Sequence, residues 1–111
     1  MKNVNIINLT PHTINFVDAE GNAILSVPAS GQLARVSAKT VTSDVTYNGI
    51  PVTYTSYGEV EGLPEREENT IYVVSSLVAS RIPNREDVFI PNESVRDPEG
   101  RIIGCKSLGH V

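Results

Sequence analysis

The dipeptide Asn48-Gly49 constrains the fold of this chain more than any other pair of residues. It separates two runs of β-branched and polar residues, 41–47 and 50–57. Both Asn and Gly accept the positive φ of a tight type I′ turn, and such a turn joins two antiparallel strands. The sequence therefore predicts a β-hairpin over residues 41–57.

Short apolar runs recur along the whole chain and are separated by Gly, Pro, Asn and Asp, which favours many short strands over long helices. At 111 residues the chain has the usual length of one domain, and we expect a single domain over residues 1–111. The predicted fold class is α+β, mostly β: a small antiparallel or mixed sheet, barrel-like, of short strands with one short helix. The other expected strands are 4–9, 13–17, 23–27, 32–36, 71–74, 88–90, 95–96 and 101–103.

The expected helix follows the most apolar of these strands. Residues 71–74 form a continuous apolar run, which is typical of a strand buried on both faces. Ser75 or Ser76 can cap a helix that continues to Arg81, and a proline ends it. The stretch 58–69 before this strand carries most of the acidic residues, so we expect an exposed loop there.

Charge and composition argue against several classes of partner. A formal net charge of -4 opposes a binder of duplex nucleic acid, whose affinity depends on Lys and Arg. No run approaches the roughly 18 to 20 apolar residues that cross a bilayer, so we expect no membrane partner. Residues 1–8 lack an apolar signal core, which predicts a cytoplasmic location. A single cysteine, Cys105, agrees with that location, and its apolar neighbours favour a buried, inert thiol.

Residues that carry catalysis or bind metals are few. His12, His110 and Cys105 are the chain's only nitrogen and sulfur donors of that kind, so we expect no metal site and no cofactor. Nucleophilic catalysis would have to use His12, and no Gly-x-Ser-x-Gly motif supports it. We expect a protein without catalytic residues, and a small hydrolase with His12 as general base remains an alternative.

The junction between strand 71–74 and the helix is the best candidate for a binding site. Free N–H groups in the first turn of a helix bind anions, and serine hydroxyls add donors. We therefore expect a phosphate at Ser75 and Ser76, although an ordinary helix start would give the same two serines. Arginines are the cations expected near it, because a guanidinium group binds phosphate through two parallel hydrogen bonds: Arg81, Arg85 and Arg96.

Motifs spread over nearly the whole chain carry a resemblance to a known family. They are the start Asn8-Leu9-Thr10-Pro11-His12, the segments 57–64, 72–79 and 83–87, and the end from Val95-Arg96-Asp97 to Gly104-Cys105. Together they resemble a family of short bacterial and bacteriophage proteins of obscure function. The motifs are specific for the family and do not specify a reaction.

By analogy, small phage-borne domains of this kind resemble anti-defence proteins that sequester nucleotide immune signals made by the host. The resemblance implies the cytoplasm of a bacterial host and a phosphate-containing ligand, such as a cyclic nucleotide or an ADP-ribose derivative. Polar groups at turns or strand ends are further candidates for gripping it: Thr10, His12, Arg96 and Asp97.

Two further expectations concern partners. An alternative function is a protein-binding module that inhibits a host enzyme through exposed strand edges or the acidic loop. We also expect a homo-oligomer, because so small a domain forms a deep pocket most easily between subunits.

Overall fold

The computed structural model describes residues 4–110. Residues 1–3, part of the N-terminal stretch predicted to lack a signal core, lie outside this range. The described chain forms strands β1 (Asn5–Asn8), β2 (Ile14–Val17), β3 (Ala23–Val27), β4 (Arg35–Tyr47), β5 (Ile50–Glu61), β6 (Thr70–Val73), helix α1 (Ser76–Ser80), β7 (Val88–Arg96) and β8 (Ile102–Gly109).

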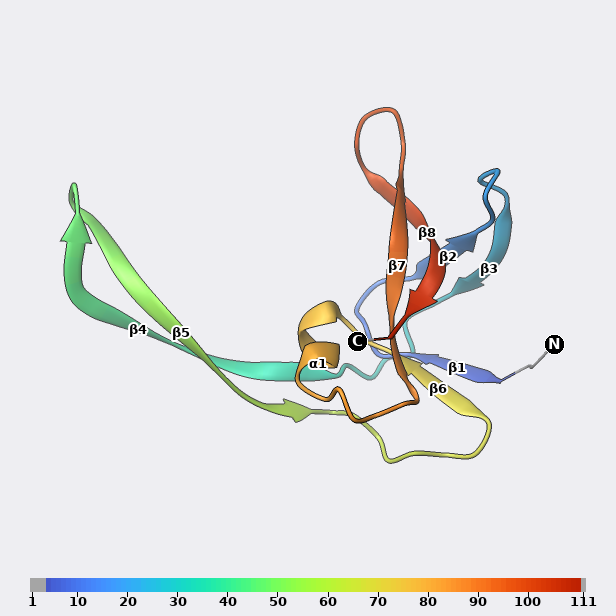
Figure 1. Ribbon diagram of the computed structural model, residues 1–111, viewed down its shortest axis with the longest axis horizontal. Helices are drawn as coiled ribbons and strands as arrows, with labels where there is room; N and C mark the ends of the chain where they lie inside the picture. The colour runs from blue at the N-terminus through green and yellow to red at the C-terminus, as the bar shows by residue number, and fades with distance from the viewer. Residues whose placement is uncertain (1–3, 111) are drawn as a thin grey trace.

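Six of these strands form one mixed sheet, which is the body of the molecule. Its order is β1-β6-β7-β8-β2-β3, and β4 and β5 form a separate two-stranded ribbon (Figure 1). The outer strands β1 and β3 contact each other, so the sheet nearly closes on itself. The predicted fold class, a mostly β, barrel-like sheet with one short helix, is confirmed.

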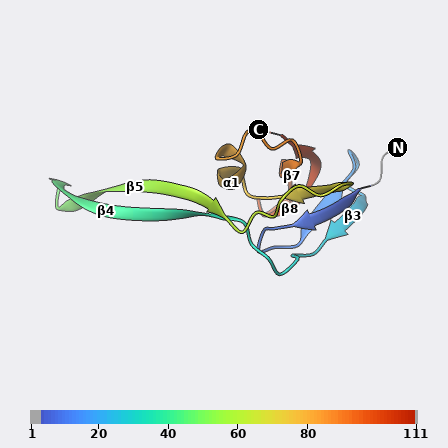
Figure 2. The ribbon, with the colours of Figure 1, turned by 90° about the horizontal axis from the view of Figure 1, so that it is seen from below.

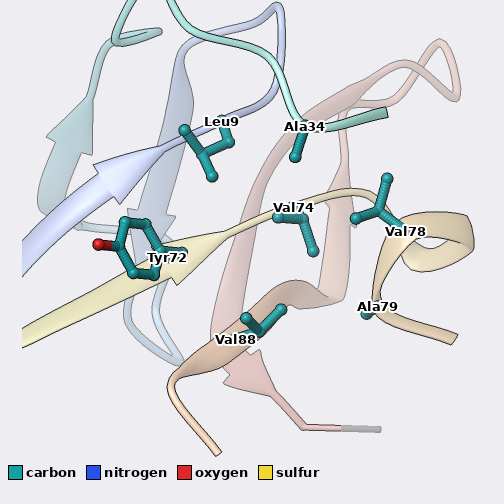
Figure 3. Packing of buried hydrophobic residues seen from close by; sticks show 7 residues of the cluster. All are labelled: Leu9, Ala34, Tyr72, Val74, Val78, Ala79 and Val88. Carbon is teal, nitrogen blue, oxygen red and sulfur yellow. The ribbon is translucent and has the colours of Figure 1, made fainter. Parts of the chain in front are cut away.

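Strand β6 separates two clusters of buried side chains. Tyr72 belongs to a cluster on one side that also contains Leu9 and Val78 (Figure 3), and Val73 belongs to a cluster on the other side with Phe16. The strands β1 and β7 both pair with β6 in parallel, so β6 lies inside the sheet. Burial on both faces explains why this strand is apolar without alternation, as predicted.

The ribbon of β4 and β5 projects from the body as a long arm (Figures 1 and 2). The predicted hairpin is confirmed: Asn48 and Gly49 have φ angles of 51° and 81°, and Tyr47 pairs with Ile50. The arm raises the radius of gyration to 17.2 Å, whereas a compact chain of this length has roughly 13 Å.

The arm is longer than the sequence predicts. The strand expected over residues 32–36 does not exist separately, because the chain runs into β4 at Arg35 and continues to the turn. On the return side, β5 includes Glu59 and Glu61, so the acidic connection covers only residues 62–69. Cross-strand pairing along the ribbon extends both strands beyond their apolar runs.

Strand β7 also differs from its prediction, because it does not stop at Pro91. It continues to Arg96 and pairs with β8, to which the turn at residues 97–100 connects it. Its pairing with β6 ends at Phe89, so beyond that residue β8 is the one strand of the described chain that pairs with β7. A proline is tolerated in a strand that is paired on one side.

Gly62 forms the bend at which the arm returns to the body. Its φ is +83°, and a Cβ atom there would collide with the carbonyl oxygen of Leu33. We expect Gly62→Ala to lower the free energy of unfolding by about 2 kcal/mol or more, because strain and collision add. Gly49→Ala is the matched control: its φ is +81° with nothing within 4 Å, so it should lose only about 1 kcal/mol. Urea denaturation measures both, and equal losses would contradict the role of the collision.

Candidate binding cleft

A cleft lies where the parallel strands β1 and β6 end. Asn8 is in register with Val73, so the segments that follow the two strands reach the same edge of the sheet. The cavity there has a volume of about 410 Å³, within the range of small-molecule sites. Apolar, hydroxyl-bearing and other polar residues line it together: Thr10, Pro11, His12, Thr13, Ile14, Asn15, Val74, Ser75, Ser76, Pro91, Ser94, Ile102, Ile103 and Cys105.

Four of the eight residues proposed from the sequence line this cleft: Thr10, His12, Ser75 and Ser76. They come from two segments more than sixty positions apart, which the β1–β6 pairing brings together. The other four residues, Arg81, Arg85, Arg96 and Asp97, lie elsewhere.

Asn8 fixes the wall of the cleft on the β1 side. Its side chain is 1 % exposed and donates to the carbonyl oxygens of His12, at 2.7 Å, and Val27, at 3.1 Å. Its side-chain oxygen accepts from the backbone N–H and the hydroxyl of Thr10, at 2.9 and 2.7 Å. Thr10 is therefore held inside the protein's own network, and its hydroxyl proton is already engaged there.

The serine pair divides between two roles. Ser75 is the N-cap of α1, and its hydroxyl accepts from the N–H of Val78 at 3.4 Å. Ser76 begins the helix and is exposed at the cleft. The helix covers only residues 76–80, so its dipole is small, and Ser76 is the hydroxyl better placed to contact a ligand.

Arg81 lies at the opposite end of α1, where it is the C-cap residue. It lines a separate, more polar depression together with Gly58, Glu59 and Ile82. Within the described residues, the helix therefore separates Arg81 from the serines that the sequence suggested it would accompany.

Arg85 has a structural partner instead of a ligand. Its guanidinium group forms a bidentate pair with Asp87, with both N–O distances 2.8 Å, and also donates to the carbonyl oxygen of Pro64 at 3.1 Å. The hydroxyl of Tyr72 donates to the neighbouring carbonyl of Glu65 at 3.0 Å. These two contacts hold the acidic connection, residues 62–69, against the body.

Arg96 and Asp97 belong to the tip of the β7–β8 hairpin. Arg96 donates to the carbonyl oxygen of Gly100 at 2.7 Å, and the Asp97 carboxylate accepts from the backbone N–H of Glu99 and Arg101, each at 2.9 Å. The carboxylate closes the turn, which accounts for the polar sequence at this point.

The titratable groups at the cleft are His12 and Cys105. His12 is exposed, and its backbone N–H and C=O belong to the network around Asn8. Cys105 is buried, and this burial raises the pKa of its thiol. The buried thiol confirms the sequence prediction, and a raised pKa disfavours the nucleophilic thiolate.

Sequence reasoning missed Asn8 and the apolar part of the lining. An Asn whose side chain accepts from the residue two positions later is a common turn element, so Asn8-Leu9-Thr10 could have been read as one. Ile102 and Ile103 gave no comparable signal, because two adjacent isoleucines in a strand ordinarily include one buried side chain. Here both are more than half exposed.

The described part of the chain, residues 4–110, contains no group of three or more His, Cys, Asp or Glu residues able to hold a metal ion. None of its helices is long and apolar enough to cross a membrane. Comparison of the chain with protein-family models, with curated proteins and with solved structures finds no match.

We expect Asn8→Ala to lower the free energy of unfolding by about 2 to 4 kcal/mol, because it leaves buried partners without their hydrogen bonds. Asn15→Ala is a suitable control, since Asn15 lies on β2, is exposed and accepts only from the hydroxyl of Ser26. Thermal and urea denaturation measure the difference. A loss at Asn8 no larger than at Asn15 would refute the role of the network.

The Arg85–Asp87 pair predicts a dependence of stability on pH. Its hydrogen bond lowers the pKa of Asp87 below the ordinary value of 3.8. A lowered pKa stabilises the fold at neutral pH, and this stabilisation is lost as the pH falls below about 4 and through the folded-state pKa. Asp87→Asn should therefore lower the free energy of unfolding by about 2 kcal/mol at pH 7. Between pH 7 and pH 3, the stability of this variant should fall less than that of the wild type.

Urea denaturation at these two pH values, with the exposed neighbour substituted in Glu86→Gln as control, tests this prediction. An unchanged acid decline in Asp87→Asn would show that the pair contributes nothing to it.

Proposed function

We propose that this chain binds a small phosphate-containing molecule of nucleotide type in the cleft, without cleaving it. The observation that carries the proposal is the composition of the cleft at the ends of β1 and β6. An apolar wall that includes the exposed side chains of Ile102 and Ile103 meets the exposed Ser76 and His12 residues. A ligand with a flat organic part and an anionic part fits such a lining.

The position of the cleft supports the proposal independently of its composition. In open α/β sheets, the carboxyl ends of neighbouring parallel strands form a common ligand position where the loops that leave them diverge, and we propose the same position here. Strands β1 and β6 are such a pair, and their continuations carry Thr10 and Ser75. The rigid network around Asn8 keeps one wall in place before a ligand binds, which reduces the ordering cost of binding.

The charge of the cleft limits how a phosphate is held. The arginines expected from the sequence do not line it, so hydroxyl groups, backbone N–H groups and the His12 imidazole are the donors we propose. Uncharged donors of this kind bind phosphate less strongly than guanidinium groups do. The apolar wall then supplies a larger share of the affinity, and we propose the base or ribose of the ligand as its counterpart.

Isothermal titration with ADP-ribose and with cyclic di-AMP, in separate experiments, tests the proposal. We expect a dissociation constant in the micromolar range or below, on the order of −8 kcal/mol, for at least one of them. Recovery of the intact ligand from the denatured complex separates binding from hydrolysis by His12. Absence of heat with both ligands would overturn the proposal for these two classes, and turnover that His12→Ala abolishes would favour the hydrolase.

Two variants locate the site. Ile103→Glu places a carboxylate on the apolar wall and should weaken binding by at least about tenfold, or roughly 1.4 kcal/mol. Ile24→Glu is its control, because Ile24 is exposed on β3 and does not line the cleft.

Ser76→Ala should weaken binding by about fivefold through loss of one hydroxyl donor.

Ser80→Ala, at the other end of α1, should leave the affinity unchanged. Equal affinity in Ile103→Glu and wild type would exclude this cleft as the binding site.

A further inference from the structure

The arm formed by β4 and β5 leaves an unusual amount of surface uncovered. The chain exposes 7899 Å², whereas a compact protein of its mass exposes roughly 6,000 Å². The surplus of roughly 1,900 Å² is more than the approximately 800 Å² that each partner contributes to a typical stable interface. The arm therefore offers enough area for association.

The arm is also unsupported along its length. Beyond its base, where Val36 and Val60 pack against the core of the body, its side chains are mostly exposed. A two-stranded ribbon is marginally stable in water, and a third strand or a packing surface is normally needed. Exposed apolar and aromatic side chains lie on both strands: Val41, Val45, Tyr47, Ile50, Tyr54 and Tyr57.

The two free edges of the arm differ in protection against pairing. The strand β4 carries Lys39 and Asp44, and the register shift between Thr42 and Thr46 leaves extra residues on β4; a second shift, between Val36 and Ala38, leaves an extra residue on β5 beyond Tyr57. Charges and bulges of this kind block strand addition at an edge. The edge of β4 is therefore a poor site for another strand.

The edge of β5 has none of these features over residues 52–57. This segment, Val52-Thr53-Tyr54-Thr55-Ser56-Tyr57, contains no charge and no proline, and its residues 53–57 pair one by one with β4. β-branched and aromatic residues without charge form the segments most prone to pair with another strand. The nearest charge toward the body is Glu59.

We propose that β5 pairs antiparallel with β5 of a second copy of this chain within residues 52–57, with the twofold axis at one of residues 53 to 56, and that the two arms form one four-stranded sheet. An antiparallel pair of identical strands is twofold symmetric, so this edge is complementary to itself without another partner. The absence of charge avoids repulsion between equal residues across the twofold axis, and Thr and Tyr side chains pair favourably across strands. The inference is independent of the ligand proposed for the cleft.

Paired substitutions on the two strands test which edge is used. Tyr54→Lys with Thr55→Lys adds two charges to β5, whereas Val41→Lys with Thr40→Lys adds two charges to β4. Because Tyr54 is in register with Val41 and Thr55 with Thr40, the two variants change equivalent depths and faces of the arm. Far-UV circular dichroism checks that both variants keep the fold.

Sedimentation velocity over a range of concentrations measures the outcome. We expect wild type to dimerise, the β5 variant to raise the dimer dissociation constant by at least about tenfold, and the β4 variant to change it less than about threefold. Wild type that stays monomeric up to about 1 mM would overturn the proposal. An equal effect of both variants would overturn the assignment to β5. A wild-type protein that stays monomeric and forms a complex with another protein would overturn the dimer and favour the protein-binding alternative.

A cross-linking experiment gives a positive readout that does not depend on a loss of association. Cysteines introduced singly at residues 53 to 56 should form a disulfide-linked dimer at the position nearest the twofold axis. Thr40→Cys, on the opposite edge, should not form one. The natural Cys105 is buried and leaves the introduced thiol as the accessible one. Cross-linking at residue 40 and at none of residues 53 to 56 would contradict the proposal.

Discussion

The burial of β6 on both faces is the constraint on which the rest of the body depends. Tyr72 and Val73 point to opposite sides of the sheet and belong to different clusters. Each cluster is small, so neither would stabilise the body alone. Because one strand contributes to both, the elements on either side of the sheet depend on its position. The position of β6 also fixes one side of the cleft, since Val74 and Ser75 follow β6 directly.

A small number of polar contacts then fix the irregular parts of the chain. Asn8 holds the turn after β1, and Tyr72 and Arg85 hold the acidic connection through backbone carbonyl groups. Among the described residues, no buried polar side-chain atom lacks a partner. Buried groups of this kind favour one arrangement over its alternatives, because every other arrangement would leave some of them without hydrogen bonds. Some of the residues that the sequence suggested as ligand contacts take part in these structural contacts instead.

The arm contrasts with the body in how its residues are stabilised. Its ribbon depends on backbone pairing and cross-strand contacts, such as that between the hydroxyls of Thr40 and Thr55 at 3.1 Å. Residues 52–57 of β5 carry no charged side chain, whereas β4 carries Lys39 and Asp44. This asymmetry has no function in an isolated ribbon, because both edges face solvent equally. The pairing that we propose for β5 would account for this asymmetry.

The sequence by itself determined the local elements of this protein. Asn48-Gly49 specified the hairpin turn through its positive φ angles, and the apolar run 71–74 followed by serines specified the buried strand and the capped helix. These predictions succeeded because the signals lie within a few residues of each other. The predicted ends of the strands 32–36 and 88–90 were wrong. Pairing with a neighbouring strand decides how far a strand continues, and local composition does not.

The tertiary structure decided which residues meet. Only the parallel pairing of β1 with β6 brings Thr10 and His12 beside Ser75 and Ser76, and no periodicity in the sequence encodes that register. Likewise, Arg81, Arg85 and Arg96 resemble phosphate ligands in the sequence, yet a five-residue helix, a buried aspartate and a hairpin turn direct them elsewhere. Composition therefore determined which chemical groups this chain has, and the packing of β6 determined which of them share a cleft.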